Sequence, residues 1–180
     1  MIKFSMSNLK AAVRFVSLAA ALCLLACSST DATKVSSTAL KADRILVVKS
    51  SHTMTLMTHG RILNSYKVAL GRGGSGPKVR AGDNKTPEGD YVIDQKIVKS
   101  RFHLALHISY PNESDKARAV KTGVDPGGAI EIHGLPKGLG WLGPIQHEVD
   151  WTEGCIAVSN PEIEEISRLV PVGTQIEIKP

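Results

Sequence analysis

Aromatic residues are scarce in this 180-residue chain, and its positive charge is unevenly placed. Phe, Trp and Tyr together make up 4% of the sequence, so stacking platforms for single-stranded nucleic acid are not expected. The formal net charge is +5, but three of the 22 basic residues lie in the first 26 positions, where no acidic residue occurs. The remainder carries 19 basic and 17 acidic residues, a net of +2. A basic footprint is therefore lacking, and we expect no nucleic-acid partner.

Long apolar runs are also lacking, apart from one near the amino terminus. A charged start through Arg14 is followed by twelve mainly apolar positions, Phe15 to Ala26. This run is too short to span about 30 Å of hydrocarbon as a helix, and its order of charge and apolarity is typical of an export signal. We therefore expect residues 1–26 to be a signal peptide. The alternative is a buried N-terminal helix.

The end of this signal resembles a bacterial lipobox. Leu24-Leu25-Ala26-Cys27 implies cleavage before Cys27 and lipid attachment to its sulfur. Ser28 follows, which resembles Gram-negative sorting patterns and implies an outer-membrane destination facing the periplasm. We thus expect a lipid-anchored protein of the cell envelope, with the membrane as a partner through Cys27. Residues 27–42 are rich in Ser, Thr, Ala and Lys and predict a flexible tether after the lipidated cysteine.

Cysteine is scarce too, which draws attention to one thiol. Of three cysteines, Cys23 would leave with the signal and Cys27 would carry lipid, so Cys155 remains alone. A lone thiol in an oxidising compartment has no internal disulfide partner and is a candidate reactive group. The alternative is a buried small hydrophobic residue.

Residues 43–180 predict one mostly β domain with one or two short helices. An antiparallel meander is expected first, because β-branched and alternating segments are separated by the turn at His59-Gly60. A loop rich in Gly and Pro, residues 71–89, interrupts the strands, and loops of this length are often functional. Asn160-Pro161-Glu162 indicates a helix start, with Asn160 as the expected N-cap. The predicted strands are 44–49, 52–58, 62–70, 91–98, 102–108, 129–133, 155–159 and 173–179, and the predicted helices are 112–121 and one beginning at 160.

Two patterns resemble nucleotide or metal sites without the required context. Gly71 to Gly76 fits G-x-G-x-x-G, but Pro77 stands where a P-loop needs Lys and no helix pattern follows. His103 and His107 would suit zinc on a helix, but their segment alternates as a strand, where four residues span roughly 13 Å. A zinc site from His133, His147 and Cys155 lacks any ligand-pair spacing. We expect neither a metal nor a cofactor.

The strongest chemical pattern joins His133 to Cys155. A thiol with an ordinary pKa near 8.5 is mostly protonated at neutral pH, so a nucleophilic cysteine needs a base or a cation beside it. Strands ending at His133 and beginning at Cys155 would place the two side by side. Gly154 permits close backbone approach, so the N–H groups of Gly154 and Cys155 would cradle an oxyanion. We expect Cys155 to titrate as an activated thiol.

These residues also carry a resemblance to a known family. His133-Gly134 followed by Thr152-Glu153-Gly154-Cys155 resembles the L,D-transpeptidase catalytic domain (ErfK/YbiS/YcfS/YnhG, or YkuD-type). The loop from Gly82 to Tyr91 and the strand from Asp43 to Lys49 are similar to that family, and the resemblance covers nearly all of residues 43–180. Segments 108–112, 126–134 and 150–158 are closest to the YafK-like branch.

The resemblance implies a mixed, β-sandwich-like fold and metal-free acyl transfer. Cys155 would be the nucleophile, His133 its base, and the Gly134 carbonyl would orient the imidazole. The implied partner is a peptidoglycan stem peptide, attacked at the L-centre of meso-diaminopimelate. Two positions depart from the family: Glu153 stands where many members have His, and Ala157 where many have Arg, a natural clamp for a carboxylate. Three further residues are candidates for substrate binding: Thr152, Trp151 (a substrate wall or a core anchor) and Lys85.

Three functions stay open at this point. The first is L,D-transpeptidation, in which an amine resolves the acyl-enzyme. The second is L,D-endopeptidase or amidase activity, in which water resolves it and an existing peptidoglycan or peptidoglycan–lipoprotein link is cut. The third is a non-catalytic lipoprotein that binds the cell wall.

Overall fold

The computed structural model describes residues 40–180. The expected signal peptide, the expected lipidation site Cys27 and most of the expected tether lie outside these residues. Among the residues described, no helix is both long and apolar enough to cross a membrane. The elements are β1 (Arg44–Val48), η1 (a 3-10 helix, Lys49–Ser51), β2 (Thr53–Thr58), β3 (Arg61–Lys67), β4 (Gly89–Ser100), β5 (His103–Ile108), α1 (Glu113–Thr122), β6 (Glu131–His133), η2 (a 3-10 helix, Gly140–Glu148), β7 (Ile156–Ala157), α2 (Asn160–Leu169) and β8 (Gln175–Lys179).

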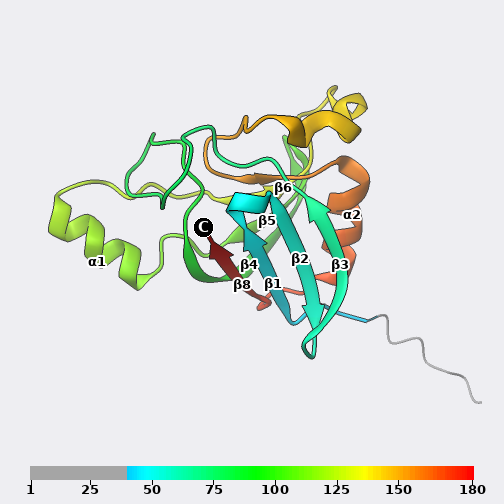
Figure 1. Cartoon of the computed structure of the whole chain (residues 1–180), viewed down its shortest axis with the longest axis horizontal. Coiled ribbons are helices and arrows are strands. Elements are labelled where there is room, and N and C mark those ends of the chain that lie inside the picture. Colours follow the sequence, from blue (N-terminus) through cyan, green and yellow to red (C-terminus); the bar gives the residue numbers. More distant parts are fainter. Residues whose placement is uncertain (1–39) are drawn as a thin grey trace, which may run out of the picture. The chain divides into compact units, whose positions relative to one another are not determined.

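The strands form one curled sheet in the order β3-β2-β1-β8-β4-β5-β6-β7 (Figure 1). The first three make the expected antiparallel meander. The last strand, β8, lies parallel to β1 and antiparallel to β4, so it joins the meander to the rest. The long β4 pairs with β8 through residues 89–92 and with β5 from Ile93 onward. The prediction of a mostly β, mixed domain with one or two helices is confirmed.

The core follows from the alternation seen in the sequence. Met54 and Leu56 on β2 are fully buried, as are Ile45 and Val47 on β1, because alternate side chains of a strand point to one face. Helix α2 packs on the sheet near β5 and buries Ile163 and Ile166 within the same apolar cluster. Burial of such a side chain contributes about 1.5–3 kcal/mol, so this face of α2 is what fixes the helix on the sheet.

Both helices have the caps that their sequences favour, with one correction. The Asn112 side chain accepts from the Asp115 N–H, and Gly123 ends α1 in the left-handed conformation. For α2, however, the expected cap Asn160 is wrong by one residue, because Ser159 and Glu162 form the capping box instead. Asn160 uses its side chain elsewhere and accepts a hydrogen bond from the Leu135 N–H at 2.9 Å. The first turn of α2 is thereby tied to the segment that follows β6.

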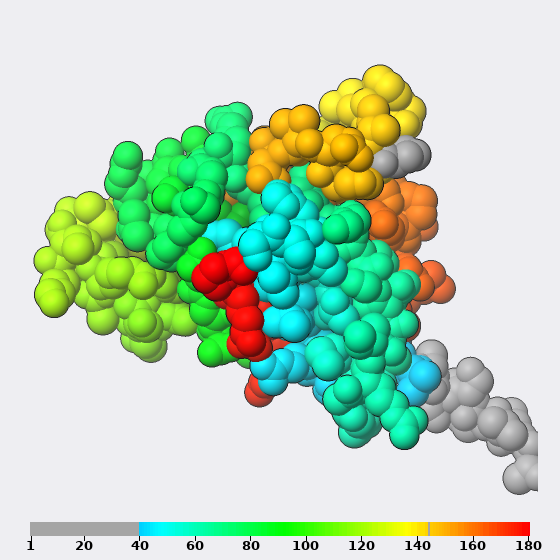
Figure 2. Space-filling model, in the orientation of Figure 1, coloured from blue at the N-terminus to red at the C-terminus, as the bar shows by residue number. Residues whose placement is uncertain are grey.

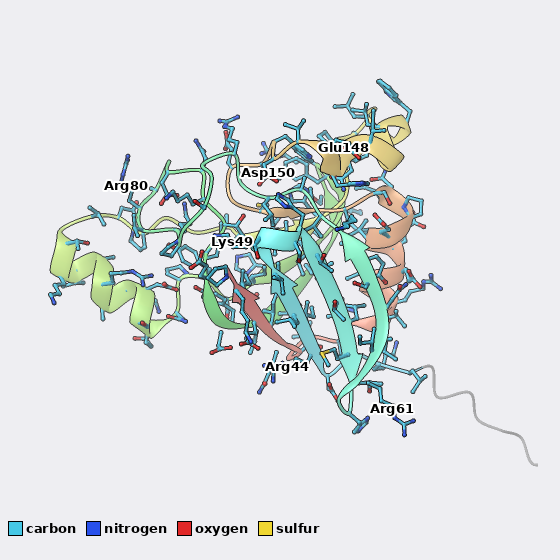
Figure 3. All side chains as sticks on the ribbon, viewed as in Figure 1. Arg44, Lys49, Arg61, Arg80, Glu148 and Asp150 are labelled. Carbon is cyan, nitrogen blue, oxygen red and sulfur yellow. The ribbon has the colours of Figure 1, made fainter. Side chains whose placement is uncertain are left out.

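Two loops lie side by side at the end of the sheet where β1 meets η1. The Arg72 N–H donates to the Thr152 carbonyl, and the Thr152 N–H donates to the Leu70 carbonyl, at 3.0 and 3.1 Å. The space-filling view shows the two segments in contact, with residues near 150 in orange (Figure 2). Figure 3 places Lys49 and Asp150 at this end and Arg44 and Arg61 at the opposite end. The loop of residues 71–88, free of regular strands and helices, therefore borders the segment that leads to Cys155.

Candidate active site

Strand pairing brings Cys155 and His133 to one face of the sheet. Strands β6 and β7 are parallel, with Ile132 opposite Ile156 and His133 opposite Ala157. One residue earlier in the same register, Glu131 lies opposite Cys155. Because side chains alternate and neighbouring strands lie about 4.8 Å apart, Glu131, His133, Cys155 and Ala157 share a face. Glu131, His133 and Cys155 line one cavity of about 840 Å³.

The imidazole of His133 is held as a neutral base. Its side chain is 1% exposed, and Nδ1 lies 2.6 Å from the Gly134 carbonyl oxygen, the contact that the family resemblance implies. Burial lowers the pKa of His133 to about 4, and the nearby Arg101 charge acts in the same direction. At neutral pH the ring is therefore uncharged. Since a carbonyl oxygen accepts only, Nδ1 carries the proton and Nε2 presents a lone pair.

An aromatic stack fixes the plane of this ring. Phe102 stacks on His133 with ring centroids 4.1 Å apart and planes inclined by 19°. Trp151 meets the imidazole edge-on at 5.7 Å, and the guanidinium of Arg101 lies 4.5 Å over the Phe102 ring. The sequence predicts Phe102 only as a strand residue and gives Arg101 no role. Their contact with the site depends on the pairing of β5 with β6, which no local spacing reveals.

Gly134 is required by its neighbours. A Cβ at this position would lie 2.7 Å from Asn160 Oδ1, 3.0 Å from Ile163 Cγ2 and 3.0 Å from the Phe102 carbonyl oxygen. The backbone of residue 134 thus fits between α2 and the start of β5. The carbonyl that orients His133 is consequently held by the packing of two other elements.

The thiol of Cys155 is protonated in this environment. Burial raises its pKa to about 11, and the negative charge of Glu131 adds to the increase, whereas the Glu131 N–H and Arg101 oppose it. Sγ lies 3.6 Å from the Ala129 carbonyl oxygen, to which it donates a weak hydrogen bond. This raised pKa is opposite in direction to the activated thiol that the sequence predicts, because His133 is neutral and supplies no cation. Any thiolate must form as the proton passes to a base.

The turn before Cys155 is built by Thr152. Its hydroxyl accepts from the Gly154 N–H at 3.1 Å and donates to the Cys155 carbonyl at 2.7 Å. Thr152 is buried, and both of these hydrogen bonds of its hydroxyl are made within the turn. Gly154 has φ +124°, and a Cβ there would lie 2.7 Å from the Lys85 carbonyl oxygen. Of the two N–H groups expected to bind an oxyanion, that of Gly154 is therefore already used by Thr152.

The other two candidates for substrate binding differ in position. Trp151 lines the cavity and donates from Nε1 to Gln146 Oε1 at 3.4 Å, so it forms a wall that is itself fixed. Lys85 does not line the cavity. Its side chain runs beside Gly73 and Gly76, whose added Cβ atoms would lie 2.8 Å from its Cγ and 3.4 Å from its Nζ.

The glycine-rich loop has a packing role. A Cβ on Gly71 would lie 2.2 Å from the Asn84 carbonyl oxygen, and one on Gly73 would lie 2.1 Å from that of Asp83. Burial alone would raise the pKa of Asp83, but hydrogen bonds from Lys78 and three backbone N–H groups hold it well below its usual value. The side chains of Lys78 and Asp83 are almost fully buried, and Lys78 Nζ lies 2.9 Å from Asp83 Oδ1. The phosphate-loop pattern thus reflects close backbone contact.

The three other histidines considered above as metal ligands or bases pair with carboxylates. His103 lies 2.7 Å from Glu164 and His107 2.6 Å from Asp94. His147, on η2, lies 3.4 Å from Glu148. Within residues 40–180, no three His, Cys, Asp or Glu side chains converge as ligands of a metal ion.

The sequence model of the YkuD family, the L,D-transpeptidase catalytic domain, matches residues 42–178, and the chain belongs to this family. Among curated sequences it is similar to Escherichia coli K12 YafK, whose name assigns it provisionally to the L,D-transpeptidases. They are 34% identical over 112 residues, which cover 61% of this chain and 38% of YafK. The E. coli O157:H7 protein gives the same values. The match thus spans well under half of these relatives.

Solved structures give the same fold. The helical cell shape determining protein Pgp2 of Campylobacter jejuni has a TM-score of 0.59 and 25% identity, covering 76% of this chain and 47% of Pgp2. An L,D-transpeptidase of Mycobacterium smegmatis has a TM-score of 0.51 and 17% identity, covering 77% of this chain and 59% of that one. The family predicted from the motifs is confirmed.

Proposed function

We propose that the chain is a cysteine acyltransferase that acts on peptidoglycan stem peptides as an L,D-transpeptidase. The observation that carries this proposal is the placement of a neutral, oriented His133 and of Cys155 on the wall of one cavity. A base of low pKa beside a thiol of high pKa suits transfer of the proton during attack, rather than a preformed ion pair.

The reaction proceeds in two balanced steps. Sγ of Cys155 attacks the carbonyl of the L-centre of meso-diaminopimelate while His133 Nε2 takes the thiol proton. The C–N bond then breaks, and the leaving amine receives that proton from Nε2. In the second step an acceptor amine attacks the thioester, Nε2 takes its proton, and the thiol recovers it as the C–S bond breaks. The Cys155 N–H would stabilise the oxyanion in both steps.

Hydrolysis of an existing link is the second candidate, and Ala157 favours it. This residue is fully buried and stands opposite His133, where many family members have Arg. Without a fixed cation there, a free C-terminal carboxylate loses a charged hydrogen bond worth about 1.5–3 kcal/mol. A bulky leaving group that is already linked, such as a lysine of a peptidoglycan-bound lipoprotein, would be affected less.

Product analysis separates the two activities. Wild-type protein and Cys155→Ala would be incubated with a tetrapeptide plus an acceptor amine, and separately with sacculi that carry linked lipoprotein or dimers. A new amide from the first mixture, absent with Cys155→Ala, supports transfer. Release of the linked partner without a new amide replaces transfer by hydrolysis. Failure of both, with sacculus binding retained, would favour a non-catalytic wall-binding role.

We also propose that lipid on Cys27 anchors the domain to the outer membrane, facing the periplasm. The support is the Leu24-Leu25-Ala26-Cys27 pattern and the polar tether that follows. Cys27→Ala should release the protein from the membrane fraction or leave it unprocessed. Normal membrane retention of a correctly processed variant would contradict this anchor.

A further inference from the structure

Glu131 places an unpaired carboxylate beside the nucleophile. It precedes His133 by two residues on β6, faces the same cavity, and stands next to Cys155 across the β6–β7 pair. No ion pair or side-chain hydrogen bond involves its carboxylate within the described chain, yet no fully buried polar atom there lacks a partner. The carboxylate oxygens are therefore not fully buried, in a residue that lines the cavity. Burial raises the pKa of Glu131, so a positively charged ligand group would stabilise its charged form.

Arg101 supplies the matching cation. Its guanidinium lies 4.5 Å over the Phe102 ring and lines the same cavity, and no carboxylate oxygen in residues 40–180 lies within 4.0 Å of it. The positive charge of Arg101 acts to lower the pKa of Glu131, of His133 and of Cys155, although burial outweighs it for Glu131 and Cys155. Arg101 therefore lies near all three groups. Arg101 and Glu131 thus line the same cavity without forming an ion pair with each other.

The other cations of the cavity wall are already paired. Arg72 lies 3.1 Å from Glu153, and Lys78 lies 2.9 Å from Asp83. Among the described lining residues, Arg101 is therefore the cation without a carboxylate partner, and Glu131 is the acid without a cationic partner. A ligand that bears only one sign of charge would satisfy one of them and leave the other unpaired.

We propose that Arg101 and Glu131 form a subsite for a zwitterionic amino-acid end, with Glu131 binding the ammonium and Arg101 the carboxylate. The inference rests on the proposed function for its ligand, the free D-centre of meso-diaminopimelate. That centre carries an ammonium and a carboxylate on one carbon. It is joined to the L-centre by four C–C bonds of about 1.5 Å, a reach of roughly 5 Å, which matches the spacing of adjacent strand positions.

This subsite restricts the donor strand. An ammonium bound by Glu131 must be free, so a stem peptide already cross-linked through its D-centre amine would be a poor donor. Selection then comes from the side chain of the attacked residue and not from a cation at position 157. Arg101, in the turn between β4 and β5, would bind the D-centre carboxylate, which is a different group from the C-terminal carboxylate that an Arg at position 157 would hold.

Binding to an inactive protein tests the subsite apart from turnover. Full-length Cys155→Ala would be titrated by calorimetry with three tetrapeptides: one with meso-diaminopimelate, one with its D-centre carboxylate amidated, and one with its D-centre amine acetylated. Each modified peptide should bind about 10- to 100-fold more weakly, as expected for loss of a charged hydrogen bond. Adding Arg101→Gln should abolish the preference over the amidated peptide alone. Adding Glu131→Gln should abolish the preference over the acetylated peptide alone.

Matched controls come from an ion pair at the other end of the sheet. Arg44 pairs with Glu177, and Figure 3 shows Arg44 far from the Asp150 loop. Arg44→Gln and Glu177→Gln should leave both preferences unchanged. Should Arg101→Gln fail to fold, Arg101→Lys keeps the charge without the planar fork and should give a smaller preference.

Several results would overturn the subsite: equal affinity for the three peptides, no binding of any of them, or equal weakening of all three by Arg101→Gln. Selective binding by Cys155→Ala combined with a wild-type protein that forms no acyl-enzyme would sink the proposed function and leave the subsite standing. The reverse result, acyl-enzyme formation without peptide selectivity, would remove the subsite alone.

Discussion

The reactivity of Cys155 should increase with pH in a way that distinguishes a protonated, half-buried thiol from a thiolate–imidazolium pair. Cys23 and Cys27 would be replaced by Ser in the full-length chain, so that Cys155 is the only thiol. The increase in its pKa from 9.0 to about 11 lowers the thiolate fraction at pH 7.5 by about 100-fold. The higher basicity raises the intrinsic nucleophilicity of the thiolate by roughly 6- to 10-fold. Alkylation should therefore be about tenfold slower than that of free cysteine.

The assay is the alkylation rate with iodoacetamide from pH 5 to 11, followed by intact mass. The rate should rise about tenfold per pH unit up to pH 10, whereas free cysteine levels off near pH 9. Two variants should shift the profile in opposite directions: Glu131→Gln to lower pH, because a negative charge is removed, and Arg101→Gln to higher pH. A plateau of fast reaction between pH 5 and 8 that disappears in His133→Ala would refute the reasoning, since it would reveal an ion pair.

Three further predictions concern stability, measured by denaturant unfolding. The pKa of His133 is about 4 in the folded protein and 6.5 in the unfolded chain, so the unfolded chain binds the proton more tightly. The free energy of unfolding should therefore be highest above pH 6.5 and should decrease by up to about 3 kcal/mol as the pH falls to 4. This pH dependence should be reduced in His133→Gln, and an unchanged slope would contradict it. Gly134→Ala should cost about 1–3 kcal/mol through overpacking, whereas Gly128→Ala, with open space around it, should cost little. Asp83→Asn leaves Lys78 buried without its carboxylate and should cost about 3–5 kcal/mol; a loss below 1 kcal/mol would show that the pair does not hold the loop.

Much of the architecture was determined by local sequence. A β-branched run marked β1, and period-two alternation marked β2 and β5. An Asn at the start and a Gly at the end marked α1 within one residue. These signals work because side-chain direction in a strand and the unpaired N–H groups of a first helical turn are local properties. The nucleophile and base were also proposed from the sequence, because only Cys and His in that pattern supply a thiol and a neutral base.

Tertiary structure alone decided what surrounds them. Phe102 and Arg101 reach the imidazole through strand pairing, and Glu131 stands beside Cys155 because β6 and β7 are in register. Lys85, chosen from its loop, does not line the cavity, and its side chain lies beside Gly73 and Gly76. The protonation states likewise depend on burial, which turns an expected thiolate into a thiol and an ordinary histidine into a weak base. Burial and register are sums over contacts between residues distant in the chain, so no local pattern records them.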